Sequence, residues 1–99
     1  MGFHTIIEIK IKDNTTYAKY VEKVRAIVEK YNGRYLVRGG KITPIFGGWN
    51  PERIIVIEFL SSEDVKLWLS SPEYKEIAAL REASTITKAI MVEGVGGEV

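Results

Sequence analysis

The order of strand-like and helix-like periodicity along the chain limits the possible folds more than any other feature. Residues 3–11 alternate between apolar and polar side chains, which predicts a strand. Residues 17–31 instead repeat apolar side chains three and four positions apart, which is typical of an amphipathic helix, and Asn32-Gly33 ends it. The later part of the chain adds predicted strands at 34–41, 53–60 and 86–93, and a helix in two pieces that begin at Ser61 and at Ser71-Pro72.

This order, βαββαβ, predicts an α+β fold of the ferredoxin-like type. Such a fold is a four-stranded antiparallel sheet with helices on one face. The length of 99 residues suits one domain, which we place at residues 1–95. We expect residues 96–99, the end of a glycine-rich segment, to form a flexible tail.

Composition excludes several classes of function. The net charge of +1 gives no support to binding of nucleic acid, because neutralising phosphates requires a basic surplus. The chain has no cysteine and a single histidine, so we expect no metal site and no cofactor. No apolar run is long enough to cross a membrane, and no leader is evident. The expected location is the cytoplasm.

The sheet face that the helices leave uncovered is unusually apolar. Strand alternation places on this open face His4, Ile6, Glu8, Arg34, Leu36, Arg38, Ile54, Val56 and Glu58. A freely solvated face would carry fewer aliphatic side chains. We therefore expect a homodimer in which two copies stack sheet to sheet and enclose these residues.

The segment "GRYLVRGG" at residues 33–40 places two arginines four positions apart on a predicted strand. An even spacing puts Arg34 and Arg38 on one face, and the phase of the strand makes this the open face. Enclosed guanidinium groups need carboxylate partners or a bound anion. Glu8 and Glu58 are available as partners, and a small organic anion is the alternative.

Several motifs occur together in one order along the chain. They are Gly33–Gly40, Trp49, Pro51-Glu52-Arg53, Ile57-Glu58-Phe59, Trp68, Ser71-Pro72-Glu73-Tyr74, Arg81 and Glu93-Gly94. In this combination the chain resembles a bacterial and archaeal family of about 100-residue proteins known as a domain of unknown function, within the dimeric α+β barrel superfamily. The resemblance implies a ferredoxin-like homodimer. Because related superfamily members include cofactor-independent monooxygenases, isomerases and haem-handling proteins, it does not settle the function.

One position departs from the family pattern. Family members usually carry an acidic residue and a glycine shortly before the tryptophan, whereas this chain reads Ile45-Phe46-Gly47-Gly48-Trp49. Chemistry that depends on that acid would be missing here.

The candidate site residues follow from these patterns. Arg34, Arg38 and Trp49 are candidates for ligand binding, and His4 and Glu58 are weaker candidates for proton transfer. We expect a homodimer that binds a small organic molecule, anionic or neutral, either between sheet and helices or at the open face inside the barrel. The alternatives are a non-catalytic structural or interaction module and a cofactor-independent monooxygenase-like or isomerase-like enzyme.

Overall fold

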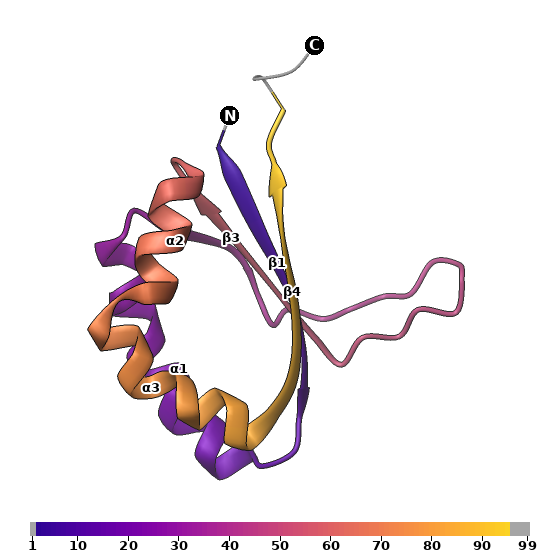
Figure 1. The fold of residues 1–99 in the computed structure, drawn as a ribbon. Coiled ribbons are helices and arrows are strands. Elements are labelled where there is room, and N and C mark those ends of the chain that lie inside the picture. Colours follow the sequence, from indigo (N-terminus) through magenta and orange to yellow (C-terminus); the bar gives the residue numbers. More distant parts are fainter. Residues whose placement is uncertain (1, 96–99) are drawn as a thin grey trace.

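The computed structural model describes residues 2–95, so the predicted tail at 96–99 lies outside the described residues. The elements follow the predicted order: β1 (Phe3–Ile11), α1 (Asn14–Lys30), β2 (Arg34–Arg38), β3 (Arg53–Phe59), α2 (Ser62–Ser70), α3 (Pro72–Ser84) and β4 (Thr85–Glu93). The strands form one sheet in the order β2-β3-β1-β4, with neighbouring strands antiparallel. All three helices lie on one side of it (Figure 1). The ferredoxin-like α+β prediction is confirmed.

Local chemistry explains where the helices begin and end. Asp13 caps α1 by accepting a hydrogen bond from the backbone N–H of Thr16. After α1, Asn32 adopts a positive φ of 66°. Ser71 serves two helices at once, because its hydroxyl donates to the carbonyl of Trp68 in α2 and accepts from the N–H of Tyr74 in α3. This shared residue produces the predicted break between the two pieces.

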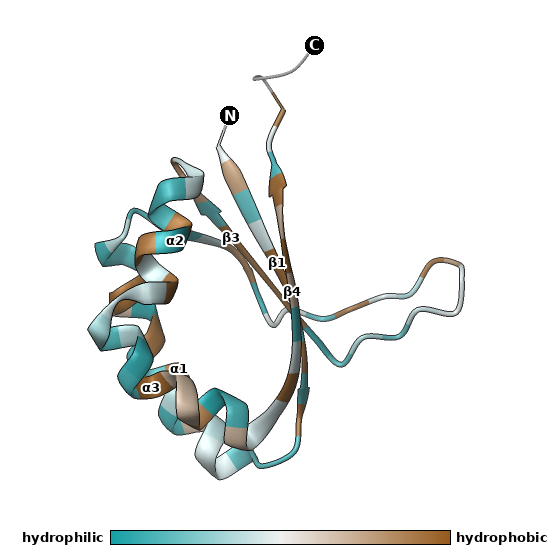
Figure 2. Ribbon diagram, in the orientation of Figure 1, coloured by the Kyte–Doolittle hydropathy of each residue, from teal (hydrophilic) through white to brown (hydrophobic). Residues whose placement is uncertain are grey.

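The core lies between the sheet and the helices. Ile57 and Phe59 of β3 are almost completely buried, and Phe59 stacks on Trp68, which in turn contacts Tyr74. The buried cluster also draws on α1, through Tyr20, Val24 and Val28. Figure 2 shows hydrophobic residues recurring at intervals along the strands and the helices.

Strand β2 departs from simple alternation. Arg34 lies opposite Glu58 and Tyr35 opposite Ile57, but the next partners are Val37 with Val56 and Arg38 with Ile55. Leu36 is therefore the extra residue of a β-bulge. The bulge reverses the phase of the strand, so Arg38 lies on the helix-covered face with Ile55. The prediction that Arg34 and Arg38 share one face is wrong for this reason.

The segment between β2 and β3, residues 39–52, contains no helix or strand and projects from the sheet on the side opposite the helices (Figure 1). Its tip turns at Gly47 and Gly48, both at positive φ. Ile45 and Phe46 are 87% and 88% exposed. We call this segment the β2–β3 arm.

Candidate functional site

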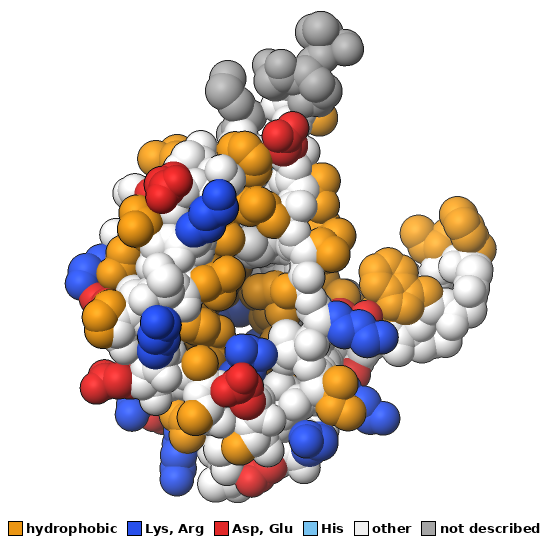
Figure 3. Space-filling view, in the orientation of Figure 1, with side chains coloured by type: hydrophobic (Ala, Val, Ile, Leu, Met, Phe, Trp, Pro, Cys, Tyr) orange, Lys and Arg blue, Asp and Glu red, His pale blue; other side chains and the backbone are white. Residues whose placement is uncertain are grey.

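A cavity of about 310 Å³ lies between the helix-covered face of the sheet and the three helices. It opens to the surface in Figure 3, where hydrophobic side chains form most of the visible wall. All four strands and all three helices contribute to the lining. The lining residues are Thr5, Ile7, Ile9, Tyr17, Tyr20, Val21, Val24, Tyr35, Arg38, Arg53, Ile55, Ile57, Val65, Trp68, Leu69, Tyr74, Arg81, Thr87, Ala89, Ile90 and Met91.

Arg38 enters the cavity from the end of β2. Its Nη2 donates to the carbonyl oxygen of Val21 in α1 at 3.2 Å, and its guanidinium carbon lies 4.8 Å from the centre of the Tyr35 ring. The bulge at Leu36 is what turns this side chain inward. Burial raises the pKa of Tyr35 to about 12, so its phenol is neutral at physiological pH.

Arg53 reaches the cavity from the first residue of β3. Its Nε donates to the hydroxyl of Tyr17 at 3.1 Å. Gly39 makes room for this side chain, because a Cβ on Gly39 would lie 1.9 Å from Nη1 of Arg53. Gly39 also has a φ of 74°, which disfavours other residues. Arg53 was not among the sequence candidates, although its spacing of two from Ile55 places it on the helix-covered face.

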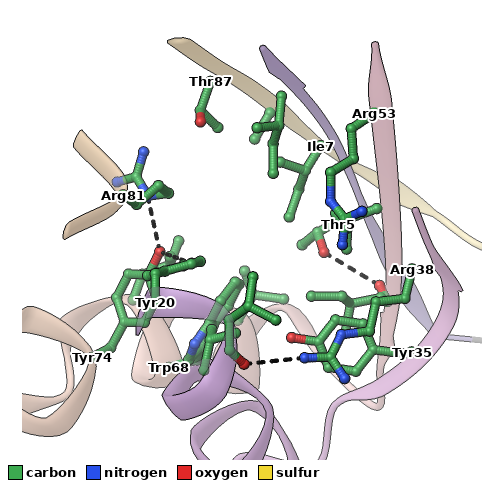
Figure 4. Close-up of a pocket in the computed structure, with 18 of the residues that line it drawn as sticks. Thr5, Ile7, Tyr20, Tyr35, Arg38, Arg53, Trp68, Tyr74, Arg81 and Thr87 are labelled. Carbon is green, nitrogen blue, oxygen red and sulfur yellow. Dashed lines mark hydrogen bonds between the residues drawn. The ribbon is translucent and has the colours of Figure 1, made fainter. Parts of the chain in front are cut away.

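A third arginine lines the cavity from α3. Nε of Arg81 donates to the hydroxyl of Tyr74 at 3.2 Å, and that hydroxyl lies 2.9 Å from the hydroxyl of Tyr20. Burial raises the pKa of Tyr20 well above its ordinary value, so this phenol is also neutral. Figure 4 shows the Arg81 cluster on one side of the cavity and Arg38 and Arg53 on the other.

The charge of the side chains that line the cavity is positive. The lining contains three arginines and no Asp, Glu, His or Lys. Within residues 2–95, none of the three guanidinium groups has a carboxylate oxygen within 4.0 Å. The buried Nε1–H of Trp68 also lacks an acceptor among the described residues. The cavity thus offers several donors and cations but no acid.

The other arginine of the pair, Arg34, lies on the open face. Its Nη2 is 2.6 Å from Oε1 of Glu58, and Nε2 of His4 is 3.6 Å from Oε2 of the same carboxylate. The hydrogen bond from Arg34 lowers the pKa of Glu58. These three predicted residues do come together, but none of them lines the cavity. Arg34 has the carboxylate partner that was one of its two predicted alternatives.

Trp49 lies in the β2–β3 arm and does not line the cavity of its own chain. Its side chain is 61% exposed. The polar cavity-lining residues that were not among the sequence candidates are Arg53, Tyr20, Tyr74 and Arg81. The seven-residue spacing of Tyr74 and Arg81 is two helical turns and puts both on one helix face, which is a usable signal.

The described part of the chain shows neither a cluster of metal-ligand side chains nor a membrane-spanning helix. Residues 2–95 contain no group of three His, Cys, Asp or Glu side chains arranged to hold a metal ion. No described helix combines the length and apolar character needed to cross a bilayer.

The comparison with known families identifies the chain. The sequence model of a family described as "Domain of unknown function (DUF1330)" matches residues 3–95. The chain therefore belongs to this family, as its motifs predicted. None of the curated proteins matches it.

Solved structures confirm the fold. A protein of unknown function from Rhodopseudomonas palustris is 16% identical with a TM-score of 0.81, over 96% of this chain and 84% of that one. A dabb (dimeric α+β barrel) family protein with a ferredoxin-like fold from Mesorhizobium loti is 11% identical with a TM-score of 0.71, over 97% and 100%. SnoaB, a cofactor-independent oxygenase from Streptomyces nogalater, is 9% identical with a TM-score of 0.65, over 97% and 96%. Two further ferredoxin-like neighbours are described as dimeric.

Proposed function

We propose that this DUF1330 protein is a homodimer that binds a small organic molecule in the cavity between its sheet and its helices. The observation that carries the proposal is the cavity itself: about 310 Å³, mainly apolar walls, and three arginines with no acid. Its volume falls at the lower end of the range for ligand pockets, and a few convergent polar groups in an apolar lining are their usual composition.

The open face supports the dimer. It is largely aliphatic, with Ile6, Ile54 and Val56 from the middle strands and exposed Val37 and Val92 from the edge strands. Contiguous apolar surface of this kind is costly in water. Neighbours of the same fold that are described as dimeric add to this support.

The β2–β3 arm gives the dimer proposal a second basis. It leaves the sheet on the side of the open face, where a second copy would stack (Figure 1). Its three large exposed side chains, Ile45, Phe46 and Trp49, have little to contact within their own chain. In the proposed dimer they pack on the partner, which removes them from water.

The cavity supports binding better than it supports proton-transfer catalysis. A general base needs a group that is unprotonated near neutral pH. The lining has no carboxylate and no imidazole, and Tyr20 and Tyr35 have raised pKa values. The predicted bases His4 and Glu58 lie on the other face of the sheet. The Tyr20 and Tyr35 phenols can donate hydrogen bonds to a ligand but do not act as bases at neutral pH.

Cofactor-independent oxygenation is the second candidate. It rests on SnoaB, a neighbour in fold that is described as a cofactor-independent oxygenase. The candidate predicts that dissolved oxygen is consumed when a bound molecule is present. Measuring oxygen uptake by the purified protein with its retained ligand distinguishes turnover from binding alone.

Native mass spectrometry of gently purified protein tests the proposal. We expect twice the subunit mass of 11.2 kDa plus a reproducible small adduct. The adduct should disappear in Arg38→Met and Arg53→Met but remain in Arg34→Met, which changes the open face. A dimer without any adduct would favour the non-catalytic interaction module, and a monomer would refute the sheet-to-sheet dimer.

A further inference from the structure

The arginines of the cavity are held by neutral partners. Arg38 donates to a backbone carbonyl, Arg53 to the Tyr17 hydroxyl and Arg81 to the Tyr74 hydroxyl. All three side chains are half-buried. A partly desolvated guanidinium gains more from an anion than from a neutral oxygen, because charge-assisted hydrogen bonds are about twice as strong. The protein itself supplies no such anion within residues 2–95.

The cations are not spread evenly around the cavity. Arg38 and Arg53 come from adjacent strand ends, at the last residue of β2 and the first of β3. Each lies near an aromatic ring, at 4.8 Å from Tyr35 and 5.7 Å from Tyr17. These rings hold the guanidinium groups at one end of the cavity, leaving their remaining N–H groups for a ligand.

The other end is polar but differently built. Arg81, Tyr74 and Tyr20 form a chain of hydrogen bonds at 3.2 Å and 2.9 Å (Figure 4). Burial raises the pKa of Tyr20, and this cluster offers hydroxyl and guanidinium donors to an uncharged oxygen. This end of the cavity has one cation, Arg81, whereas the opposite end has two, Arg38 and Arg53.

The wall between the two ends is apolar and partly aromatic. It includes Ile7, Ile55, Val65 and Trp68. A flat or cyclic hydrocarbon body suits such a wall.

We propose that the ligand is a small cyclic carboxylate with a second oxygen acceptor across the ring. Its carboxylate binds Arg38 and Arg53, its ring lies along the apolar wall, and its second oxygen, a hydroxyl or carbonyl, meets the Tyr20–Tyr74–Arg81 cluster. This inference rests on the proposed function and adds to it the charge of the ligand, its shape and its orientation in the cavity.

Three probes of one shape test the proposal. They are 4-hydroxybenzoate, 4-hydroxybenzamide, which lacks the charge, and benzoate, which lacks the second oxygen. Each is titrated into the full-length dimer, and binding is followed by the NMR amide shifts of cavity-lining residues. We expect 4-hydroxybenzoate to bind at least about tenfold more tightly than the amide, since about 1.4 kcal/mol is within reach of one charge-assisted bond. Benzoate should bind more weakly than 4-hydroxybenzoate.

Arginine-to-methionine variants show which group of the ligand binds at which end of the cavity. Arg38→Met and Arg53→Met should each weaken 4-hydroxybenzoate at least about tenfold while leaving 4-hydroxybenzamide unchanged. Arg81→Met should reduce the advantage of 4-hydroxybenzoate over benzoate. Arg25→Met is the matched control, because Arg25 pairs with Glu29 on the exposed side of α1 and does not line the cavity. It should change none of these affinities.

Failure of the inference and failure of the proposed function look different. Equal binding of acid and amide, with shifts confined to the cavity, would overturn the charge assignment and leave the cavity as a binding site. Acid binding that survives in Arg38→Met and Arg53→Met would likewise overturn it. Absence of shifts with every probe would refute this ligand class. Only the same absence together with an adduct-free native mass spectrum would also remove the proposed function.

Discussion

Arg34 and Arg38 lie four residues apart on β2 and point to opposite sides of the sheet. Leu36 is the extra residue between them, so Arg34 pairs across the ladder with Glu58 and Arg38 with Ile55. One guanidinium meets a carboxylate on the open face, and the other enters the cavity. One strand thereby contributes to both the proposed dimer face and the proposed ligand site.

The two arginines should give separable phenotypes. Arg38→Met is expected to abolish retention of the ligand and to leave the dimer intact, because its side chain does not reach the open face. Arg34→Met should keep the ligand and weaken the dimer, since it leaves Glu58 without its strongest partner. Native mass spectra of both variants at matched concentrations check this. Loss of the ligand in Arg34→Met with an intact dimer would contradict the assignment.

Gly39→Ala should destabilise the protein and disturb Arg53. The added Cβ would lie 1.9 Å from Nη1 of Arg53, and the φ of 74° costs a side chain about 1–2 kcal/mol. We expect a loss of that order in the free energy of unfolding, measured with urea, together with weaker ligand retention.

Gly40→Ala is the matched control for this change. A Cβ at Gly40 would meet nothing within 4 Å, and its φ is not positive. It should leave stability and ligand retention almost unchanged. Equal effects of the two substitutions would mean that Gly39 has no special role.

Tyr20→Phe tests the hydrogen-bonded cluster at the α3 end of the cavity. The Tyr20 and Tyr74 hydroxyls lie 2.9 Å apart and share one hydrogen bond, and Nε of Arg81 also donates to the Tyr74 oxygen. Removing the Tyr20 oxygen leaves the buried Tyr74 hydroxyl without this hydrogen-bond partner, which costs about 1–3 kcal/mol. Urea unfolding measures the loss. Tyr31→Phe removes a hydroxyl that donates to Glu73 in a less buried place and should cost less.

The pairing of Glu58 with Arg34 should make the stability of the protein depend on pH in the acidic range. Its hydrogen bond from Arg34 lowers its pKa below the ordinary 4.5. A carboxylate with a lowered folded-state pKa contributes stability above its unfolded pKa and loses that contribution as the pH falls through the folded value. The stability difference between the wild type and Glu58→Gln should therefore be constant near neutral pH and shrink below about 4.5. A difference that stays constant down to strongly acidic pH would contradict the pairing.

The β2–β3 arm should act through the partner subunit. Replacing Phe46 and Trp49 with serine removes two large exposed apolar side chains at some distance from the cavity. We expect a higher dissociation constant of the dimer, measured by analytical ultracentrifugation, with an unchanged circular dichroism spectrum. Trp49→Phe is the conservative control and should retain most of the affinity. An unchanged dimer would remove the proposed role of the arm.

Sequence periodicity predicted the fold well because each element carries its own signal. The alternation in β3 correctly places Ile55, Ile57 and Phe59 against the helices, and Ser71-Pro72 correctly marks the break between α2 and α3. The expected strand at 34–41 is shorter in the structure, because the chain leaves the sheet after Arg38.

The candidate site was predicted less well, for two physical reasons. Strict alternation fails at Leu36, because a bulge is a property of the paired ladder and has no distinct signature in "RYLVR". The cavity itself depends on how far the helices stand from the sheet, which no single element encodes. Arg53 is different, since its phase relative to Ile55 was readable from the sequence.

A crystal structure of protein purified gently, without refolding or dialysis, tests the central claim most directly. The account predicts a dimer stacked through the open faces, with Arg34 and Glu58 paired there. It also predicts electron density for a small molecule between sheet and helices, in contact with Arg38 and Arg53. A cavity closed by its own side chains, with Arg38 and Arg53 paired to carboxylates of the protein, would contradict it.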